Sequence, residues 1–595
     1  MHFGGIYEDE IVGKAYDRKL LGRFLGYLAP YRRLAVASLL LLPLIAAAKL
    51  AQPWLIKIAI DGHIVSGKME GLPLLAFWYF SLILADGFLT YLEIYLLQLM
   101  GQKVMFDMRT GLFAHVQRLS SSFFDRTPTG SLVTRVTSDV EALGEMFTAG
   151  IISVVGDILV LVGIVSIMLW MNLKLSLVTF TVLPVLIYIV FAFRNRMRAS
   201  FREVRVRLSN MNSFLAESIG GMAVIQLFNR QETEQREFTR LNASYRDANL
   251  PVITWDAALF AAVEALSSIA VGLIIWYGGA EIINGTLTFG ALVAFIQYME
   301  KFFSPIRDLS AKYSIMQGAM AALERIFGLM DTESAQRNHK DLPGFENPAG
   351  LDSPAETIQF RDVWFAYNSA DYVLKGFNLT IRKGEKIALV GETGGGKTTV
   401  TRLLSRYYEV DQGSITMNGR DIRDIPLQCL RKRIGVILQE PFLFSGTIAY
   451  NISLGDVEAR GRMEQAAVMV GADRFIMNLP QRFEEEVRER GGNFSVGERQ
   501  LISFARAVAF DPEILVLDEA TSSVDSASER LIQEGLKGLL AGRTSLVVAH
   551  RLSTIRDADR IVVIHKGEKA EEGSHEELMA LQGLYYRLYQ LQFKD

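Results

Sequence analysis

The chain has 595 residues, which is too long for one ordinary domain. Its residues are 50% hydrophobic and its mean hydropathy is +0.21, so the composition is too apolar for a typical soluble protein. The formal net charge of −3 gives no sign of nucleic-acid binding, and the single cysteine, Cys429, excludes an intrachain disulfide and a multi-cysteine metal site.

Apolar residues divide the sequence into two parts. Long uncharged runs fill the first part, whereas the second alternates like a soluble α/β domain. The polar stretch between them is rich in proline and glycine, which is typical of a linker. The sequence therefore predicts an N-terminal segment, a membrane domain, a linker and a C-terminal domain, at residues 1–31, 32–325, 326–354 and 355–595.

The N-terminal segment contains a short basic amphipathic stretch at residues 12–31. Its lysines and arginines alternate with leucine and aromatic residues, which favours a helix lying along the cytoplasmic membrane surface. An ordinary surface helix is the alternative. The N-terminus shows no short apolar run with a cleavage site, so we expect no signal peptide.

Apolar runs long enough to cross a bilayer follow, since about 20 residues of helix suffice. We expect six spans, at residues 34–60, 72–101, 144–170, 173–194, 253–280 and 287–320. The connections after the second and fourth spans are long and carry most of the arginines, which places them and both termini in the cytoplasm. The sequence thus predicts a multi-pass protein of the inner (plasma) membrane.

The two long connections keep apolar residues at helical spacing, so we expect the spans to continue as rods into the cytoplasm. Each pair of rods needs a turn at its tip, near residues 120–140 and 212–230. A short helix at each tip would contact the C-terminal domain; the alternative is a plain helical hairpin without a partner.

Acidic residues lie inside or near the spans, namely Asp86, Glu93, Asp157 and Glu264. Ionised groups are costly there and tend to face a cavity or one another. A cavity lined in this way would favour cationic amphiphiles. Positions at membrane edges, or hydrogen bonds between helices, are the alternatives. A cluster of basic residues lining the cavity would favour an anionic lipid, and we see none inside the spans beyond Lys49 and Lys57, near the first.

The C-terminal domain contains a phosphate-binding loop of the form G-x-x-x-x-G-K-[ST] between a predicted strand and a predicted helix. Its backbone N–H groups and the N-terminal end of the helix would hold phosphate oxygens. Lys397 would reach the β- and γ-phosphates, and Thr398 would ligate Mg²⁺. The candidate nucleotide-binding residues are Gly391, Glu392, Thr393, Gly394, Gly395, Gly396, Lys397, Thr398 and Thr399.

Other candidate residues end predicted strands. The run Ile514-Leu-Val-Leu delivers Asp518 to the Mg²⁺ side of the loop, and Glu519 would polarise the attacking water. His550 follows another apolar run and would hold the γ-phosphate or the water. Gln439 follows a third and would reach Mg²⁺ or the water. Tyr367 would stack on a purine ring.

With these motifs in this order, the chain resembles an ABC exporter half-transporter along essentially its whole length. The resemblance implies a bundle of six transmembrane helices with long cytoplasmic extensions, as in type I exporters, followed by an α/β P-loop ATPase domain. It also implies two ATP molecules with Mg²⁺, each held between one subunit's phosphate loop and the other subunit's signature. The chain has one of each part, so it must pair with a second half-transporter.

The signature departs from the usual L-S-G-G-Q, because this chain reads Phe494-Ser-Val-Gly-Glu498. Ser495 and Gly497 remain and would contact phosphate at a helix N-terminus. The negative charge of Glu498 should weaken that contact. An altered signature beside an intact Glu519 and His550 resembles the competent half of an asymmetric pair, so we favour a heterodimer, with a homodimer as the alternative.

The resemblance implies an ATPase that exports hydrophobic or amphipathic small molecules, drugs or lipids, by alternating access. A lipid flippase is one alternative, and a non-transporting regulator or channel on the same fold is another. The expected partners are a second half-transporter, membrane lipids and a small-molecule substrate, without nucleic acid. No motif in the sequence identifies the substrate.

Overall fold

The computed structural model describes residues 17–332, 354–368, 371–518, 526–549 and 552–593. The chain forms two compact units. The first comprises Met1–Gln117 and Thr129–Thr332, and the second comprises Arg118–Pro128 and Glu333–Asp595. The short segment 118–128, which is the expected first tip, therefore groups with the C-terminal domain.

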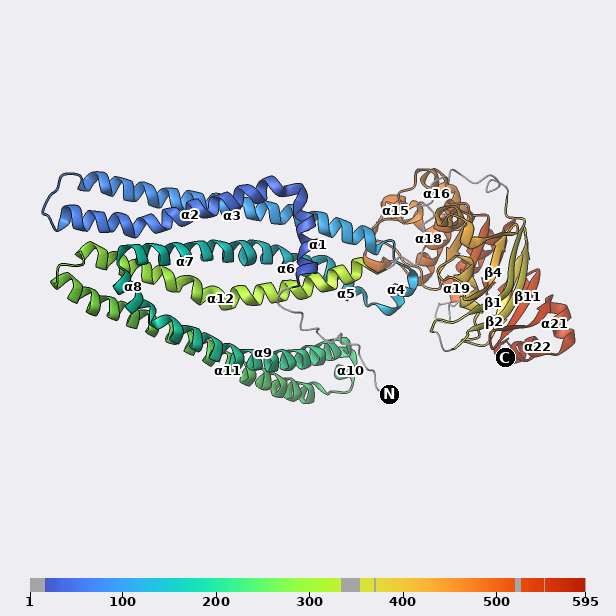
Figure 1. Ribbon diagram of the computed structural model, residues 1–595. Helices are drawn as coiled ribbons and strands as arrows, with labels where there is room; N and C mark the ends of the chain where they lie inside the picture. The colour runs from blue at the N-terminus through green and yellow to red at the C-terminus, as the bar shows by residue number, and fades with distance from the viewer. Residues whose placement is uncertain (1–16, 333–353, 369–370, 519–525, 550–551, 594–595) are drawn as a thin grey trace. The chain divides into compact units, whose positions relative to one another are not determined.

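The first unit is built from helices, several of them very long (Figure 1). The 45 residues of α3 and the 53 residues of α11 correspond to about 65–80 Å of helix at ~1.5 Å per residue. That length is more than twice a hydrocarbon core of about 30 Å, as the expected rods require. The helices are α1 (Arg18–Leu28), α2 (Arg32–Ala59), α3 (Leu72–Val116), α5 (Thr129–Thr134), α6 (Val140–Glu145), α7 (Ile152–Met171), α8 (Leu173–Phe180), α9 (Val182–Gly220), α10 (Met222–Leu227), α11 (Gln231–Ile283) and α12 (Phe289–Met330).

Within the described residues, five helical stretches are long and apolar enough to cross a membrane, judged by length and composition. They are Arg18–Ile64, Leu72–Val116, Thr129–Met171, Leu173–Gly220 and Gln231–Ile283. The sixth expected span falls on α12, which is helical throughout but is not among the five, and which carries Glu300 and Lys301 in its middle.

Helix α12 is tied to its neighbours by polar contacts as well as by apolar packing. The hydroxyl of the fully buried Tyr298 donates to the carbonyl oxygen of Leu50 on α2 at 2.6 Å. The ammonium of Lys301 donates to the carbonyl oxygen of Lys49 at 3.0 Å and to Oε1 of Gln52 at 2.8 Å. These contacts hold α12 against α2. Two of them are made by Lys301, which lies inside the sixth expected span, 287–320.

The expected amphipathic helix of the N-terminal segment is α1, and residues 12–16 of the prediction lie outside the described residues. Phe24 and Leu28 on α1 are buried. Arg23 donates to both carboxylate oxygens of Asp331, at 2.7 and 2.8 Å, and lies 4.2 Å from the ring centre of Phe327. The helix is thereby fastened to the C-terminal end of α12, just before the expected linker.

Helices α9 and α11 pack along one another, and α10 forms the turn between them (Figure 1). This turn is the second expected tip. Its apolar side chains are exposed in the isolated chain: Val224 is 58%, Leu227 79% and Phe228 72% accessible.

The second unit contains a four-stranded sheet in the order β2-β1-β4-β5 and a six-stranded sheet in the order β12-β11-β3-β10-β9-β6. Strands β11, β3, β10, β9 and β6 are parallel, and β12 is antiparallel to β11. A short pair, β7–β8, completes the set. The strands are β1 (Thr357–Phe365), β2 (Leu374–Arg382), β3 (Lys386–Gly391), β4 (Gln412–Met417), β5 (Arg420–Asp421), β6 (Ile434–Ile437), β7 (Gly446–Thr447), β8 (Glu486–Val487), β9 (Ile514–Asp518), β10 (Thr544–Val548), β11 (Arg560–His565) and β12 (Glu568–Gly573).

The middle of the six-stranded sheet is buried on both faces, which explains its uninterrupted apolar sequence. On β10, Leu546 and Val548 face one hydrophobic core and Val547 faces the other. The helices of this unit are α4 (Ser121–Arg126), α13 (Lys397–Leu404), α14 (Leu427–Arg433), α15 (Ile448–Ser453), α16 (Val457–Met469), α17 (Asp473–Ile476), α18 (Val496–Ala509), α19 (Ser526–Leu540), α20 (Leu552–Arg556), α21 (His575–Leu581) and α22 (Leu584–Phe593).

Helix α4 is the first expected tip, and it contacts the nucleotide half of its unit. The hydroxyl of Tyr408 donates to the carboxylate of Asp125. Arg126 donates to the carbonyl oxygen of Tyr367 at 2.9 Å. These two hydrogen bonds place α4 against the nucleotide half of its unit, next to the aromatic candidate of the nucleotide site.

Candidate functional site

The phosphate-binding loop connects β3 to α13, as its sequence predicted. Gly391, Gly394 and Gly396 adopt positive φ angles of 152°, 82° and 105°, which side chains disfavour. A Cβ atom added at Gly391 would lie 2.2 Å from the carbonyl oxygen of Ile564 on the neighbouring strand β11. Glycine is required here by a close backbone approach as well as by the dihedral angles.

Lys397 begins α13 and is only 6% exposed. Its ammonium donates to the carbonyl oxygens of Gly391 and Glu392, both at 2.8 Å. Burial lowers the pKa of Lys397, and the charge of Asp518 opposes that shift. Among the described residues no carboxylate forms an ion pair with this ammonium. A buried cation at a helix N-terminus, wrapped by a glycine-rich backbone, fits a bound phosphate chain.

Thr398 and Asp518 meet at the carboxyl edge of the parallel sheet. The hydroxyl of Thr398 donates to Oδ1 of Asp518 at 3.3 Å. Strands β3, β10 and β9 are parallel neighbours in the sheet, with β10 in the middle. Their carboxyl ends therefore lie at the same edge, which brings Asp518 at the end of β9 close to the phosphate-binding loop that follows β3. A hydroxyl and a carboxylate are oxygen ligands suited to Mg²⁺. Gln439 follows β6, the strand on the other side of β9, and its side chain is exposed.

Tyr367 lies just after β1, beside the loop rather than remote from it. Its hydroxyl shares a hydrogen bond with Oγ1 of Thr399 at 3.1 Å. Its ring packs edge-on against Phe365 at 4.9 Å and Tyr408 at 5.1 Å between ring centres. Sequence reasoning could assign this tyrosine only by its order among the motifs, and the fold brings it to the same site.

The altered signature has a structural explanation that our sequence reading missed. Ser495 caps the N-terminus of α18, accepting a hydrogen bond from the backbone N–H of Glu498 at 3.3 Å. The carboxylate of Glu498 accepts in return from the backbone N–H of Ser495 at 2.8 Å. This pair of hydrogen bonds is a capping box, which the spacing S-x-x-E in the sequence predicts. Glu498 therefore stabilises the helix end that Ser495 and Gly497 were expected to offer to a phosphate.

We expect the substitution Glu498→Gln to preserve the helix and to strengthen ATP binding. Glutamine can still close the capping box, so the melting temperature should change little. Removing a negative charge from a helix N-terminus alters the energy of a nearby charge by about 0.3–1 kcal/mol, so the KM for ATP should fall ~2–5-fold. Glu498→Ala is the control that loses both the charge and the cap. An unchanged or higher KM in Glu498→Gln would show that the glutamate does not oppose the nucleotide.

The two remaining catalytic candidates, Glu519 and His550, lie outside the described residues. They directly follow Asp518 at the end of β9 and Ala549 after the end of β10. Their roles stay predictions.

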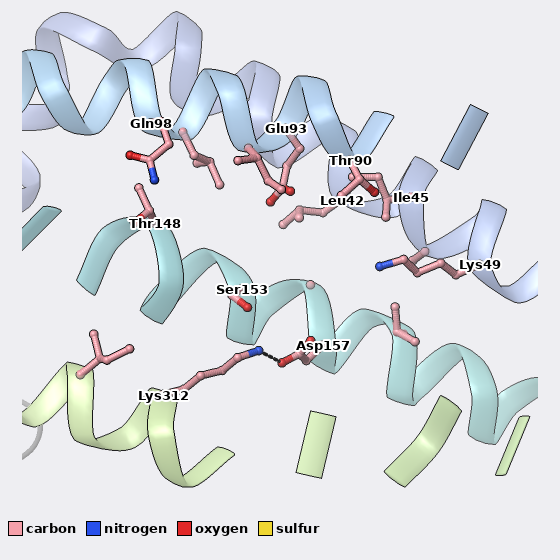
Figure 2. Close-up of a pocket in the computed structure, with 16 residues that line it drawn as sticks. Leu42, Ile45, Lys49, Thr90, Glu93, Gln98, Thr148, Ser153, Asp157 and Lys312 are labelled. Carbon is pink, nitrogen blue, oxygen red and sulfur yellow. Dashed lines mark hydrogen bonds and ion pairs between the residues drawn. The ribbon is translucent and has the colours of Figure 1, made fainter. Parts of the chain in front are cut away.

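The membrane unit contains a cavity of about 510 Å³ between α2, α3, α7 and α12 (Figure 2). Four charged side chains line it: Lys49, Glu93, Asp157 and Lys312. Lys312 of α12 forms an ion pair with Asp157 of α7. Two lysines thus line the cavity beside the two carboxylates, so the carboxylates alone do not support the expected preference for cations, which stays a prediction.

The other two acidic residues of the spans lie elsewhere. Asp86 accepts a hydrogen bond from Nε2 of Gln52 at 3.2 Å, which is the helix–helix alternative. Glu264 lies on an exposed face of α11 in the isolated chain.

These features define a membrane-embedded helical domain fused to a P-loop ATPase domain. Residues 36–306 match the family model of the ABC transporter transmembrane region, and residues 374–522 match the family model described as ABC transporter. The chain belongs to the ABC transporter family, as an exporter-type chain with both domains in one polypeptide.

Curated relatives match almost the full length. The chain is 38% identical to the uncharacterized ABC transporter ATP-binding protein YknV of Bacillus subtilis, over 98% of this chain and 96% of that protein. It is 36% identical to the ATP-dependent lipid A-core flippase of Syntrophus aciditrophicus, over 95% and 92%. It is 36% identical to the probable multidrug resistance protein YheH of Bacillus subtilis, over 88% and 77%.

A solved structure has the same fold. It is described as a bacterial Atm1-family ABC exporter with ATP bound. The TM-score is 0.78 at 26% identity, over 95% of this chain and 99% of that chain. The predicted fold class, an exporter bundle followed by an α/β ATPase domain, is confirmed.

Proposed function

We propose that the chain is one half of a dimeric exporter that uses ATP and Mg²⁺ to move amphipathic small molecules, drugs or lipids, across the inner membrane. The observation that carries this proposal is the buried Lys397 at the head of α13, beside the Thr398–Asp518 pair. The relatives named as a multidrug resistance protein and as a lipid A-core flippase support the two substrate classes.

The residue roles follow from the placement of the side chains. Lys397 and the loop glycines would hold the phosphates, and Thr398, Asp518 and Gln439 would hold Mg²⁺, whose charge would offset the phosphate oxygens during hydrolysis. Tyr367 would contact the base. Glu519 would orient the water and His550 the γ-phosphate, each from the end of a parallel strand.

The chain would work as a pair, because Ser495 and Gly497 belong to a signature that needs a second phosphate loop. The exposed apolar tip at α10 supports a partner, since Leu227 and Phe228 are 79% and 72% accessible in the isolated chain. The altered signature favours a heterodimer, and a homodimer is the alternative. The arginine-rich extensions support a cytoplasmic nucleotide domain in the plasma membrane.

A lipid flippase is the second candidate, and one observation favours it. Lys49 lines the membrane cavity, and its side chain pairs with no described residue, so it would attract an anionic headgroup. Our sequence interpretation kept a lipid flippase as an alternative, although it found no cluster of basic residues that would favour an anionic lipid.

The proposal is tested by ATPase activity of the chain purified alone in lipid, with Glu519→Gln beside the wild type. We expect hydrolysis that the substitution abolishes. Activity of the chain alone would establish a homodimer with a working variant signature. Activity that appears only with a second half-transporter would establish a heterodimer. Hydrolysis that survives in Glu519→Gln would contradict the proposed site.

A further inference from the structure

The charged groups of the membrane cavity do not all neutralise one another. Asp157 and Lys312 form an ion pair, with side chains 29% and 16% exposed. The side chains of Lys49 and Glu93 are half-buried, and neither side chain makes a hydrogen bond or an ion pair with any described residue. Figure 2 shows Lys49 and Glu93 both projecting into the cavity, from α2 and α3, while the ion pair lies across it.

Ionised groups within a membrane domain are costly when unpaired, and they usually mark the place where a polar group binds. A ligand with only a cation would pair with Glu93 and leave Lys49 without a partner. A ligand with only an anion would do the reverse. A ligand that carries both charges satisfies both side chains, and it keeps the cavity neutral because the second ion pair is already balanced.

The rest of the wall is partly apolar and partly lined by uncharged polar residues, namely Thr90, Gln98, Thr148 and Ser153. Leu42, Ile45 and Leu97 are 5%, 6% and 3% exposed, and they lie beside the charged groups of α2 and α3. The volume of about 510 Å³ lies in the usual range of small-molecule sites, ~300–1,000 Å³. The cavity thus combines two opposite charges with apolar wall residues that would accommodate a hydrocarbon chain.

We propose that this cavity binds zwitterionic amphiphiles whose headgroup carries an anionic phosphate and an ammonium group. Lys49 binds the phosphate and Glu93 binds the ammonium. The Asp157–Lys312 pair positions α7 against α12 and holds the wall in shape. The inference rests on the proposed export function and narrows its substrate class.

Direct binding to the purified full-length protein, without ATP, tests this assignment. Three single-chain probes are compared: lysophosphatidylethanolamine, dodecyl phosphate and dodecyltrimethylammonium. We expect the zwitterion to bind about tenfold or more tightly than either singly charged probe, since charge-assisted hydrogen bonds are the stronger ones. Diacyl phosphatidylethanolamine then separates the sources: competition with the probe identifies a membrane lipid, and its absence identifies a single-chain amphiphile.

Charge-specific variants distinguish binding from damage to the fold. Lys49→Gln should lower the affinity for the zwitterion and for dodecyl phosphate about tenfold. It should leave the affinity for dodecyltrimethylammonium unchanged. Glu93→Gln should lower the affinity for the zwitterion and for dodecyltrimethylammonium. It should leave the affinity for dodecyl phosphate unchanged. Lys57→Gln on α2 and Asp86→Asn on α3 are matched controls, because neither residue lines the cavity.

Equal binding of the three probes, or equal losses of all three in both variants, would overturn the inference. The ATPase assay with Glu519→Gln is scored separately. A protein that hydrolyses ATP but shows no headgroup preference would retain the proposed function and refute the substrate class. A protein that binds the zwitterion selectively but never hydrolyses ATP would support the ligand class of the cavity and refute the proposed ATP-driven function.

Discussion

Replacing Lys397 by alanine is expected to abolish most ATP hydrolysis, lowering kcat/KM by about 100-fold or more. The ammonium is the buried cation of the phosphate loop, and among the described residues its direct hydrogen-bond partners are two backbone carbonyls. A single preorganised donor at a developing charge is typically worth ~100–1,000-fold in rate. Steady-state phosphate release from the full-length protein in lipid measures the effect.

The same variant should fold. Burial lowers the pKa of Lys397, which means that the folded protein holds this charge at a cost. Removing it should therefore shift the melting temperature by only a few degrees. Lys383→Ala is the control, because that lysine is exposed and pairs with Glu356 at the surface. A loss smaller than about tenfold in Lys397→Ala, or an equal loss in the control, would contradict the assigned role.

Gly391→Ala is expected to destabilise the nucleotide domain by about 3 kcal/mol or more. The new Cβ atom would lie 2.2 Å from a backbone carbonyl oxygen of β11, and backbone atoms in a central strand cannot move away cheaply. For a domain of this size the melting temperature should fall by ~6–12 °C. Thermal unfolding of the full-length protein, followed by circular dichroism, measures it.

Gly394→Ala separates steric overlap from backbone strain. Gly394 also has a positive φ angle, 82°, but nothing lies within 4 Å of its added Cβ atom. Its substitution should cost about 1–2 kcal/mol, the strain of a left-handed alanine alone. If both variants melt at the same temperature, the close approach of the Ile564 carbonyl oxygen is not the reason why position 391 requires glycine.

The nucleotide site was predictable because its signals are local. The loop, its strand and its helix are contiguous in sequence, and buried parallel strands are recognisable as apolar runs. The cap formed by Ser495 and Glu498 is equally local and was overlooked, because the residues were compared with a family pattern instead of with helix-capping rules.

The membrane cavity could not be predicted in the same way. Asp157 and Lys312 are 155 residues apart, and only the packing of α7 against α12 brings them together. A carboxylate read alone therefore appeared to favour cations. Glu300 and Lys301 lower the hydropathy of α12, which makes this helix harder to recognise as a membrane span from its sequence. The hydrogen bond between Lys301 and Gln52 of α2 explains why the charge of Lys301 is tolerated there.

Helix α4 is connected to the phosphate loop by two successive hydrogen bonds. Arg126 binds the backbone of Tyr367, and the hydroxyl of Tyr367 binds Thr399. Any ligand that displaces Tyr367 must therefore change the free energy with which α4 is held. Thermodynamic linkage makes this relation reciprocal: the factor by which such a ligand weakens or strengthens the hold on α4 equals the factor by which that hold changes the ligand's affinity. Arg126 would therefore influence the affinity of any nucleotide that displaces Tyr367, without touching that nucleotide.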